Sequence, residues 1–181
     1  QVGLESDIEN AIATAYRNAM ADQNLEEAID GARVELGIVD STGLEELSEQ
    51  ELRDRAEDAP IVKLVNLILG QAIAERATDI HIEPLEGRLK VRYRIDGILY
   101  DLLTPPKWIQ PALISRIKVM AKLNIAEKRL PQDGRLDIKI GAQEIDVRVS
   151  TIPTSFGERV VLRLLNKTSA VFDLPEIGLS P

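Results

Sequence analysis

Hydrophobic residues recur at helical spacing through the first third of the chain. After Ser6, which forms a capping-box pattern with Glu9, one helical face carries Ile8, Ala11, Ile12, Ala15 and Tyr16. Further helices are predicted from about Asn24 and, behind a second capping-box pattern at Ser48, up to about residue 56. These helices are short and carry few large apolar residues, so we expect an appendage or linker that docks on a larger domain.

Two longer helices are predicted after Pro60. The first begins beside that proline and has a wide apolar face formed by Ile61, Leu64, Val65, Ile68, Leu69, Ala72 and Ile73. The second is expected over residues 107–123, with Ile109, Leu113, Ile117 and Met120 on one side. Trp108 lies just inside this helix, and we expect it to pack in the core rather than to stack on a ligand.

Alternating apolar and polar residues predict strands around and after these helices. The strands are expected at residues 79–83, 89–95, 98–100, 135–140, 144–150 and 158–165. Asp96-Gly97 is a tight-turn signal, and Gly141-Ala142-Gln143 joins the second hairpin. The order of elements predicts an α+β fold, with an antiparallel sheet whose helices lie on one face and whose other face is polar, preceded by a short helical N-terminal segment.

The composition excludes several classes of protein. The 181 residues are 44% hydrophobic and 29% charged, which is ordinary for a globular protein and unlike a disordered chain. Because there is no cysteine, disulfides, thiol nucleophiles and cysteine-based metal sites are excluded. We find neither an apolar run of the roughly 18–20 residues that span a bilayer nor a signal peptide, and we expect a cytosolic protein.

Charge divides the chain into two parts. The net charge of −8 argues against nonspecific binding of nucleic acid, and the few scattered aromatic residues offer single strands no stacking platform. Residues 1–60 hold 16 acidic and 4 basic residues, a charge of −12, whereas residues 61–181 hold 14 and 18, a charge of +4. We therefore expect a boundary in the acidic stretch between Ser41 and Asp58.

Arginine is the chemically notable residue of the second part. Eight arginines fall on predicted strands or loops: Arg88, Arg92, Arg94, Arg129, Arg135, Arg148, Arg159 and Arg163. The planar guanidinium group binds carboxylates or phosphates through paired hydrogen bonds, and a strand fixes its direction. An anion site is one interpretation, and a solvated sheet face is the other.

Catalytic signatures are absent from these 181 residues. There is no G-x-x-x-x-G-K-S/T, G-x-G-x-x-G or G-x-S-x-G motif, so we predict no catalytic residue and no complete enzyme. His81 shares one side of a strand with Asp79 and Glu83, a set that could bind a divalent metal. A structural histidine held by a flanking carboxylate is the commoner outcome, and we predict no metal site.

Five motifs, in order, resemble those of the secretion ATPases of type II secretion systems and type IV pilus assembly. They are ATDIHIEP at 77–84, RYRIDG at 92–97, AEKRLPQDGR at 126–135, VRVSTIPT at 147–154 and GERVVLRLL at 157–165. Thr78 stands where serine is usual in that family. The resemblance implies a fragment of a hexameric cytoplasmic ATPase, associated peripherally with the inner membrane through its partners.

The resemblance also implies a division into domains. Residues 1–59 are expected to be an acidic helical linker or the end of a preceding domain, and residues 60–172 a PAS-like domain. Residues 173–181 would lead toward a nucleotide-hydrolysing motor domain, whose Walker A loop follows a segment similar to 172–179 in this family. The implied partners are that motor domain, neighbouring subunits of the hexamer and, through the N-terminal region, inner-membrane platform proteins.

Arg148 and Arg163 match two family arginines, fifteen residues apart, that reach the phosphates of nucleotide held by the motor domain. Arg135 and Arg159 are secondary candidates, which could instead act as braces or interdomain ion pairs. ATP and Mg²⁺ are the cofactors implied for the parent protein, and none is expected to bind this chain tightly. Two alternatives stay open: a packing module of the ring, and a PAS-like sensor of a small ligand.

Overall fold

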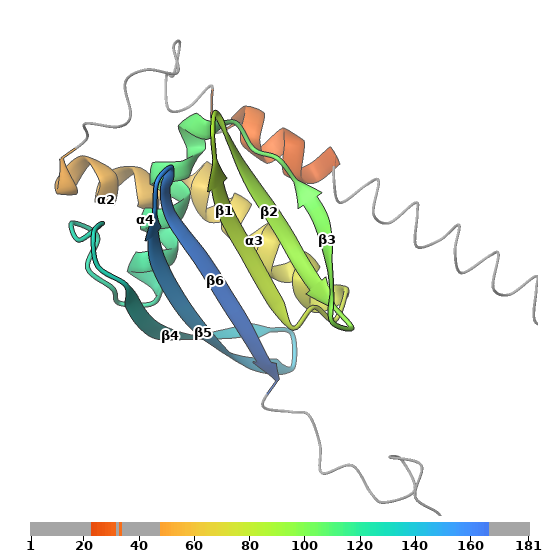
Figure 1. Ribbon diagram of the computed structural model, residues 1–181. Coiled ribbons are helices and arrows are strands. Elements are labelled where there is room, and N and C mark those ends of the chain that lie inside the picture. The colour runs from red at the N-terminus through yellow and green to blue at the C-terminus, as the bar shows by residue number, and fades with distance from the viewer. Residues whose placement is uncertain (1–22, 32, 34–47, 167–181) are drawn as a thin grey trace, which may run out of the picture.

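The computed structural model of the protein describes residues 23–31, 33 and 48–166 (Figure 1). The helix predicted after Ser6, residues 41–47 of the acidic stretch and the segment 172–179 lie outside the described residues. A helical segment at 23–31 agrees with the helix predicted from Asn24. Ser48 caps the next helix through a capping box with Glu51, also as predicted.

A single antiparallel sheet forms the centre of the fold. Its strands are β1 (Asp79–Leu85), β2 (Arg88–Ile95), β3 (Ile98–Leu103), β4 (Gln132–Ile140), β5 (Gln143–Thr154) and β6 (Gly157–Asn166). The strand order across the sheet is β3-β2-β1-β6-β5-β4 (Figure 1). The pairing of β1 with β6 therefore joins the first three strands of the sequence to the last three. The α+β class is confirmed.

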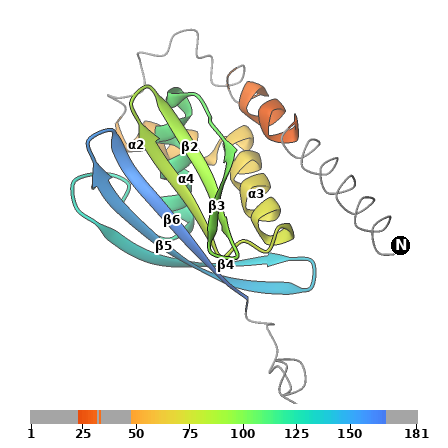
Figure 2. The same ribbon diagram turned by 45° about the vertical axis from the view of Figure 1, so that its right-hand side comes forward.

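The helices pack on one face of the sheet, as predicted, and no helix among the described residues covers the opposite face, which we call the open face (Figures 1 and 2). These helices are α2 (Glu49–Glu57), α3 (Ala59–Ala74), the 3-10 turn η1 (Lys107–Ile109) and α4 (Gln110–Met120). α3 and α4 lie against the sheet, and α2 packs on α4. Trp108 is buried and belongs to the core, as predicted. No helix among the described residues is long and apolar enough to cross a membrane.

The helix predicted over residues 107–123 begins at Lys107, as expected, but ends three residues early. It opens as η1, and α4 ends at Met120 because Lys122 adopts a left-handed φ of 58°. The N–H groups of Lys122 and Leu123 then donate to Val119 O and Lys118 O, the pattern of a Schellman motif. Arg76 ends α3 in the same way, with a φ of 57°.

Both predicted hairpins are present. Asp96 and Gly97 have φ values of 50° and 81°, as a tight two-residue turn between β2 and β3 requires. The second turn is shorter than predicted, because Gln143 already pairs with Ile140. Gly141, with a φ of 61°, supplies the left-handed residue at that turn.

A buried ion pair fixes the start of β6 to α4. The Lys118 side chain is only 1% exposed, and its Nζ lies 2.5 Å from Glu158 Oε1. The same Nζ donates to the carbonyl of Glu127 at 2.6 Å, which ties the loop after α4 to the helix. Loss of either charge therefore leaves the other buried without its partner.

Lys118→Met is expected to lower the free energy of unfolding by about 3–5 kcal/mol, because the buried Glu158 loses its counter-charge. Urea denaturation of this variant measures the loss. The matched control is Lys90→Met, since Lys90 pairs with the exposed Asp101 and its removal should cost only about 0–1 kcal/mol. Equal losses in the two variants would contradict the role assigned to Lys118.

Candidate functional site

Four arginines and one aspartate lie in a single row across five strands of the open face. Asp79 on β1 pairs with Arg94 on β2 and with Arg163 on β6. Arg163 in turn pairs with Arg148 on β5, which pairs with Arg135 on β4. We call this set the arginine row. Neighbouring strands are about 4.8 Å apart, so the backbones at Arg135 and Arg163, two strands apart, are separated by about 10 Å across the sheet.

The neighbouring row of the sheet explains why these side chains point outward. Side chains alternate between faces along each strand, and the residues one position away enter the core. That buried row is formed by Tyr93, Ile80, Leu162 and Val149. The packing of the core against α3 and α4 thus directs every guanidinium group of the arginine row to the open face.

Asp79 is the only carboxylate in the row and is already occupied. Its Oδ1 accepts a hydrogen bond from Arg163 Nε at 2.9 Å, and its Oδ2 accepts one from Thr78 Oγ1 at 3.0 Å. Arg94 Nε lies 3.6 Å from Oδ2. Burial would raise the pKa of Asp79, but the hydrogen bonds from Arg163 and Thr78, together with the charge of Arg163, hold that pKa below its ordinary value.

Arg148 and Arg135 have no ion-pair partner among the described residues, and both are exposed. Together with Arg163 they line an open pocket of about 580 Å³, which we call the arginine pocket. Its other lining residues are Asp133, Gly134, Val149, Ser150 and Val161. With three arginines against Asp133, the pocket carries an excess of positive charge and suits an anion with several oxygens.

Arg159, the fourth predicted arginine, lies outside the arginine pocket. Its Nη2 is 2.5 Å from Glu83 Oε1, and Arg92 Nη2 contacts the other oxygen of the same carboxylate. Glu83 is thus held between two arginines, much as Asp79 is. This geometry is that of a brace, one of the roles the sequence left open for Arg159.

His81 stands between the two carboxylates on the open face of β1, as the alternation predicts. Asp79 and Glu83 are bound by arginines, and neither ring nitrogen of His81 has a hydrogen-bond partner among the described residues. The described part of the chain contains no cluster of His, Cys, Asp or Glu placed to hold a metal ion. Burial lowers the pKa of His81; the charge of Glu83 opposes this, and Arg159 and Arg94 add to the lowering.

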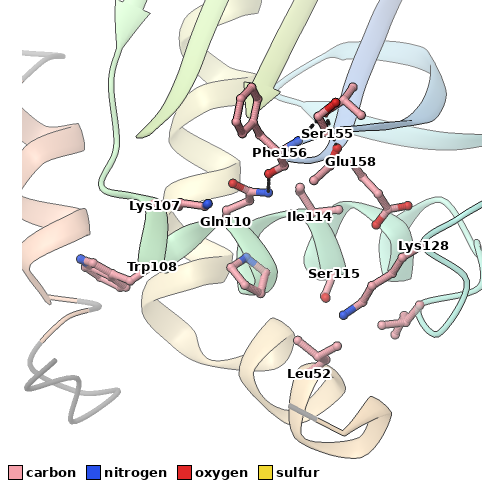
Figure 3. A pocket seen from close by; sticks show the side chains of 14 residues that line it. Leu52, Lys107, Trp108, Gln110, Ile114, Ser115, Lys128, Ser155, Phe156 and Glu158 are labelled. Atoms are coloured by element: carbon pink, nitrogen blue, oxygen red, sulfur yellow. Dashed lines mark hydrogen bonds between the residues drawn. The ribbon is translucent and has the colours of Figure 1, made fainter. Parts of the chain in front are cut away.

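A second hollow lies on the helix side of the molecule, between α2, the start of α4 and the β5–β6 turn (Figure 3). It measures about 470 Å³, and Leu52 and Phe156 form opposite walls. Gln110 Nε2 donates to the carbonyl of Phe156 across it at 3.2 Å. This hollow contains none of the arginines singled out by sequence, so the arginine pocket is the candidate site.

The arginine pocket is a basic site on the open sheet face of an α+β domain. The chain belongs to the Type II/IV secretion system protein family, whose sequence model matches residues 54–181. This result agrees with the family that the five motifs resemble.

Relatives with similar sequences carry consistent names. The chain is 48% identical to the Type II secretion system protein E of Xanthomonas campestris pv. campestris over 183 residues, which cover 99% of this chain and 30% of that protein. It is 53% identical to the Type II secretion system ATPase E of Vibrio cholerae over 137 residues, 75% of this chain and 27% of that protein. It is 54% identical to the Type IV pilus assembly ATPase PilB of Myxococcus xanthus over 129 residues, which cover 71% of this chain and 23% of that protein. The matches span between 23% and 34% of the length of these relatives and of the Type II secretion system protein E of Pseudomonas aeruginosa.

The stability of the protein is expected to fall as the pH drops below about 6.5, the ordinary pKa of histidine. Because the folded-state pKa of His81 is lowered, the unfolded chain takes up a proton first, and the stability present above pH 6.5 is lost below it. Denaturation between about pH 7 and about pH 5.5 measures this loss, and His81→Gln should reduce it. Asp79, with its pKa below 3.8, does not titrate in this window. An unchanged pH dependence in the variant would contradict the assignment to His81.

Proposed function

We propose that the arginine pocket binds the phosphates of ATP held by a nucleotide-hydrolysing domain of a secretion or pilus-assembly ATPase. Arg148 and Arg163 are the contacting residues, and Arg135 lies next to them in the same pocket. The observation that carries this proposal is the arginine row, in which three neighbouring guanidinium groups face one pocket and only Arg163 is paired to a carboxylate of the row. The resemblance of the motifs and the names of the relatives support it.

The chemistry follows from the charge that develops on the γ-phosphoryl oxygens during hydrolysis. A guanidinium group delivered to these oxygens stabilises the transition state by charge-assisted, bidentate hydrogen bonds. Strands β5 and β6 hold Arg148 and Arg163 in one direction, so the two groups arrive together when domains close. Closure would then couple hydrolysis to domain motion, and hence to protein transport or pilus assembly.

ATP and Mg²⁺ would be held by other parts of the same protein. The 181 residues contain no Walker A sequence, and a phosphate-cradling loop of backbone N–H groups is what holds a nucleotide in such ATPases. The proposed partners are the motor domain and neighbouring subunits of a cytoplasmic hexamer, with inner-membrane platform proteins reached through the N-terminal region. Nucleic acid is not among the proposed partners.

The sensor alternative finds little support in the core. Between the sheet and the helices, the described residues enclose a cavity of about 10 Å³, lined by Ile80, Leu113, Leu162 and neighbouring apolar side chains. Ligand pockets typically measure about 300–1,000 Å³. This cavity therefore has no room for a small molecule, and a sensor would have to use the hollow of about 470 Å³ on the helix side. The packing module stays as the alternative outcome of the experiment below.

In the complete ATPase, Arg148→Ala and Arg163→Ala should each lower kcat by roughly 10²–10³-fold, because each removes a contact to the transition-state charge. The melting temperature should barely change for Arg148→Ala, whose side chain is exposed and has no ion-pair partner among the described residues, and should fall modestly for Arg163→Ala, which removes one hydrogen bond from the buried Asp79. Steady-state kinetics and thermal unfolding of the same variants provide both quantities.

The matched control is Lys139→Ala, an exposed cation on β4 that lies outside the arginine pocket. It should leave kcat unchanged. If the two arginine variants melt several degrees lower with near-normal turnover, the side chains only brace the fold, and the packing-module alternative is correct.

The isolated 181-residue chain should hydrolyse no ATP and bind it weakly, because it offers arginines but no phosphate-cradling loop. Isothermal titration calorimetry with Mg·ATP tests the binding, and a phosphate-release assay tests the turnover. Tight stoichiometric binding would contradict the proposal that the nucleotide is held elsewhere, and would revive the sensor alternative.

A further inference from the structure

We infer that Asp79 is a positioning residue for the proposed reaction. It binds Nε, on the inner edge of the guanidinium group of Arg163, so that the outer edge, formed by the two Nη atoms, faces the arginine pocket. This inference rests on the proposed function. It assigns to the aspartate of the ATDIHIEP motif a role that acts through Arg163, without contact to the nucleotide.

The contact between the two residues is specific to one nitrogen. Asp79 Oδ1 accepts from Nε of Arg163 at 2.9 Å, and no hydrogen bond joins the two Nη atoms of Arg163 to any described residue. Nε is the donor nearest the side-chain stem, so a bond there orients the guanidinium plane and leaves the four N–H donors of the two Nη atoms, two of which form the outer edge. Those donors are the ones that bind a phosphate bidentately.

Asp79 is itself held firmly enough to orient another group. Its side chain is 7% exposed, against 65% for that of Arg163, so the anchor is buried and the anchored group is accessible. Thr78 donates its hydroxyl to Oδ2, and Arg94 lies on the far side of the same carboxylate. Because the lowered pKa keeps Asp79 ionised at neutral pH, its hydrogen bond to Arg163 is charge-assisted throughout the working range.

Arg148 provides the contrast. It occupies the neighbouring position of the row and lines the same pocket, but no carboxylate among the described residues binds it. One arginine of the pair is thus oriented before nucleotide arrives, whereas the other is free to adjust. Misplacement of a positioned group by about 1 Å can cost roughly 10²-fold in rate, so the anchor matters for Arg163 and not for Arg148.

The experiment is a double-mutant cycle on kcat in the complete ATPase. Asp79→Asn keeps the shape of the side chain and removes its charge, and it should lower kcat by roughly 10-fold or more with little change in KM. In an Arg163→Ala background the same substitution should cause no further loss, because the group it positions is gone. In an Arg148→Ala background the two losses should multiply.

Glu83→Gln is the matched control. Glu83 lies two residues along β1 on the same face and is also held by two arginines, but these lie outside the arginine pocket. Its kcat should equal that of the unmodified protein. A loss as large as that of Asp79→Asn would show that any lost carboxylate of β1 disturbs the site, and the inference would fail.

A second variant keeps the test decisive if Asp79→Asn does not fold. Asp79→Glu retains the charge but moves it by one methylene, so it should lower kcat in the unmodified background and not in the Arg163→Ala background. Normal kcat in both Asp79 variants, or a further loss in the Arg163→Ala background, contradicts the positioning role. If Arg148→Ala and Arg163→Ala themselves retain normal kcat, the proposed function fails instead, so the two failures are distinct.

Discussion

The antiparallel register of the sheet is the constraint on which the rest of the structure depends. On the helix-covered face it brings Tyr93, Ile80, Leu162 and Val149 into one buried row. The adjacent positions form the arginine row on the open face. A slip by one residue would exchange the two faces, burying guanidinium groups and exposing the core. The apolar core therefore holds like charges side by side, an arrangement that is itself unfavourable.

The carboxylates of β1 limit that repulsion. Asp79 and Glu83 each bind two arginines, one from each neighbouring strand, so the central strand neutralises part of the charge on β2 and β6. Beyond β6 no carboxylate of the row continues the pattern, and Arg148 and Arg135 stay unpaired among the described residues. Within the arginine row, the unpaired positive charge therefore lies on β4 and β5, beside the arginine pocket.

Local features could be predicted from the sequence, and features that depend on distant pairing could not. The alternation of apolar and polar residues and the Asp96-Gly97 turn were enough to predict the β2–β3 hairpin. The capping-box pattern at Ser48 was enough to predict the start of α2. The end of α4 was misplaced because Lys122 occupies a left-handed position where glycine is the usual signal. The three arginines of the arginine pocket were named from motifs, but their alignment with Asp79 depends on a β1–β6 pairing across 84 residues. No local pattern encodes that pairing, so the role of Asp79 became visible only in the fold.

The central claim is that the arginine pocket meets nucleotide phosphates. The most direct measurement is a structure of the complete ATPase with Mg·ADP and a metal fluoride that mimics the transferring phosphoryl group. The account predicts that Arg148 and Arg163 donate to its oxygens or fluorides at about 2.7–2.9 Å, with Arg163 Nε still bound to Asp79. A closed complex in which both arginines instead contact protein carboxylates, with the phosphates held by other residues, would contradict it.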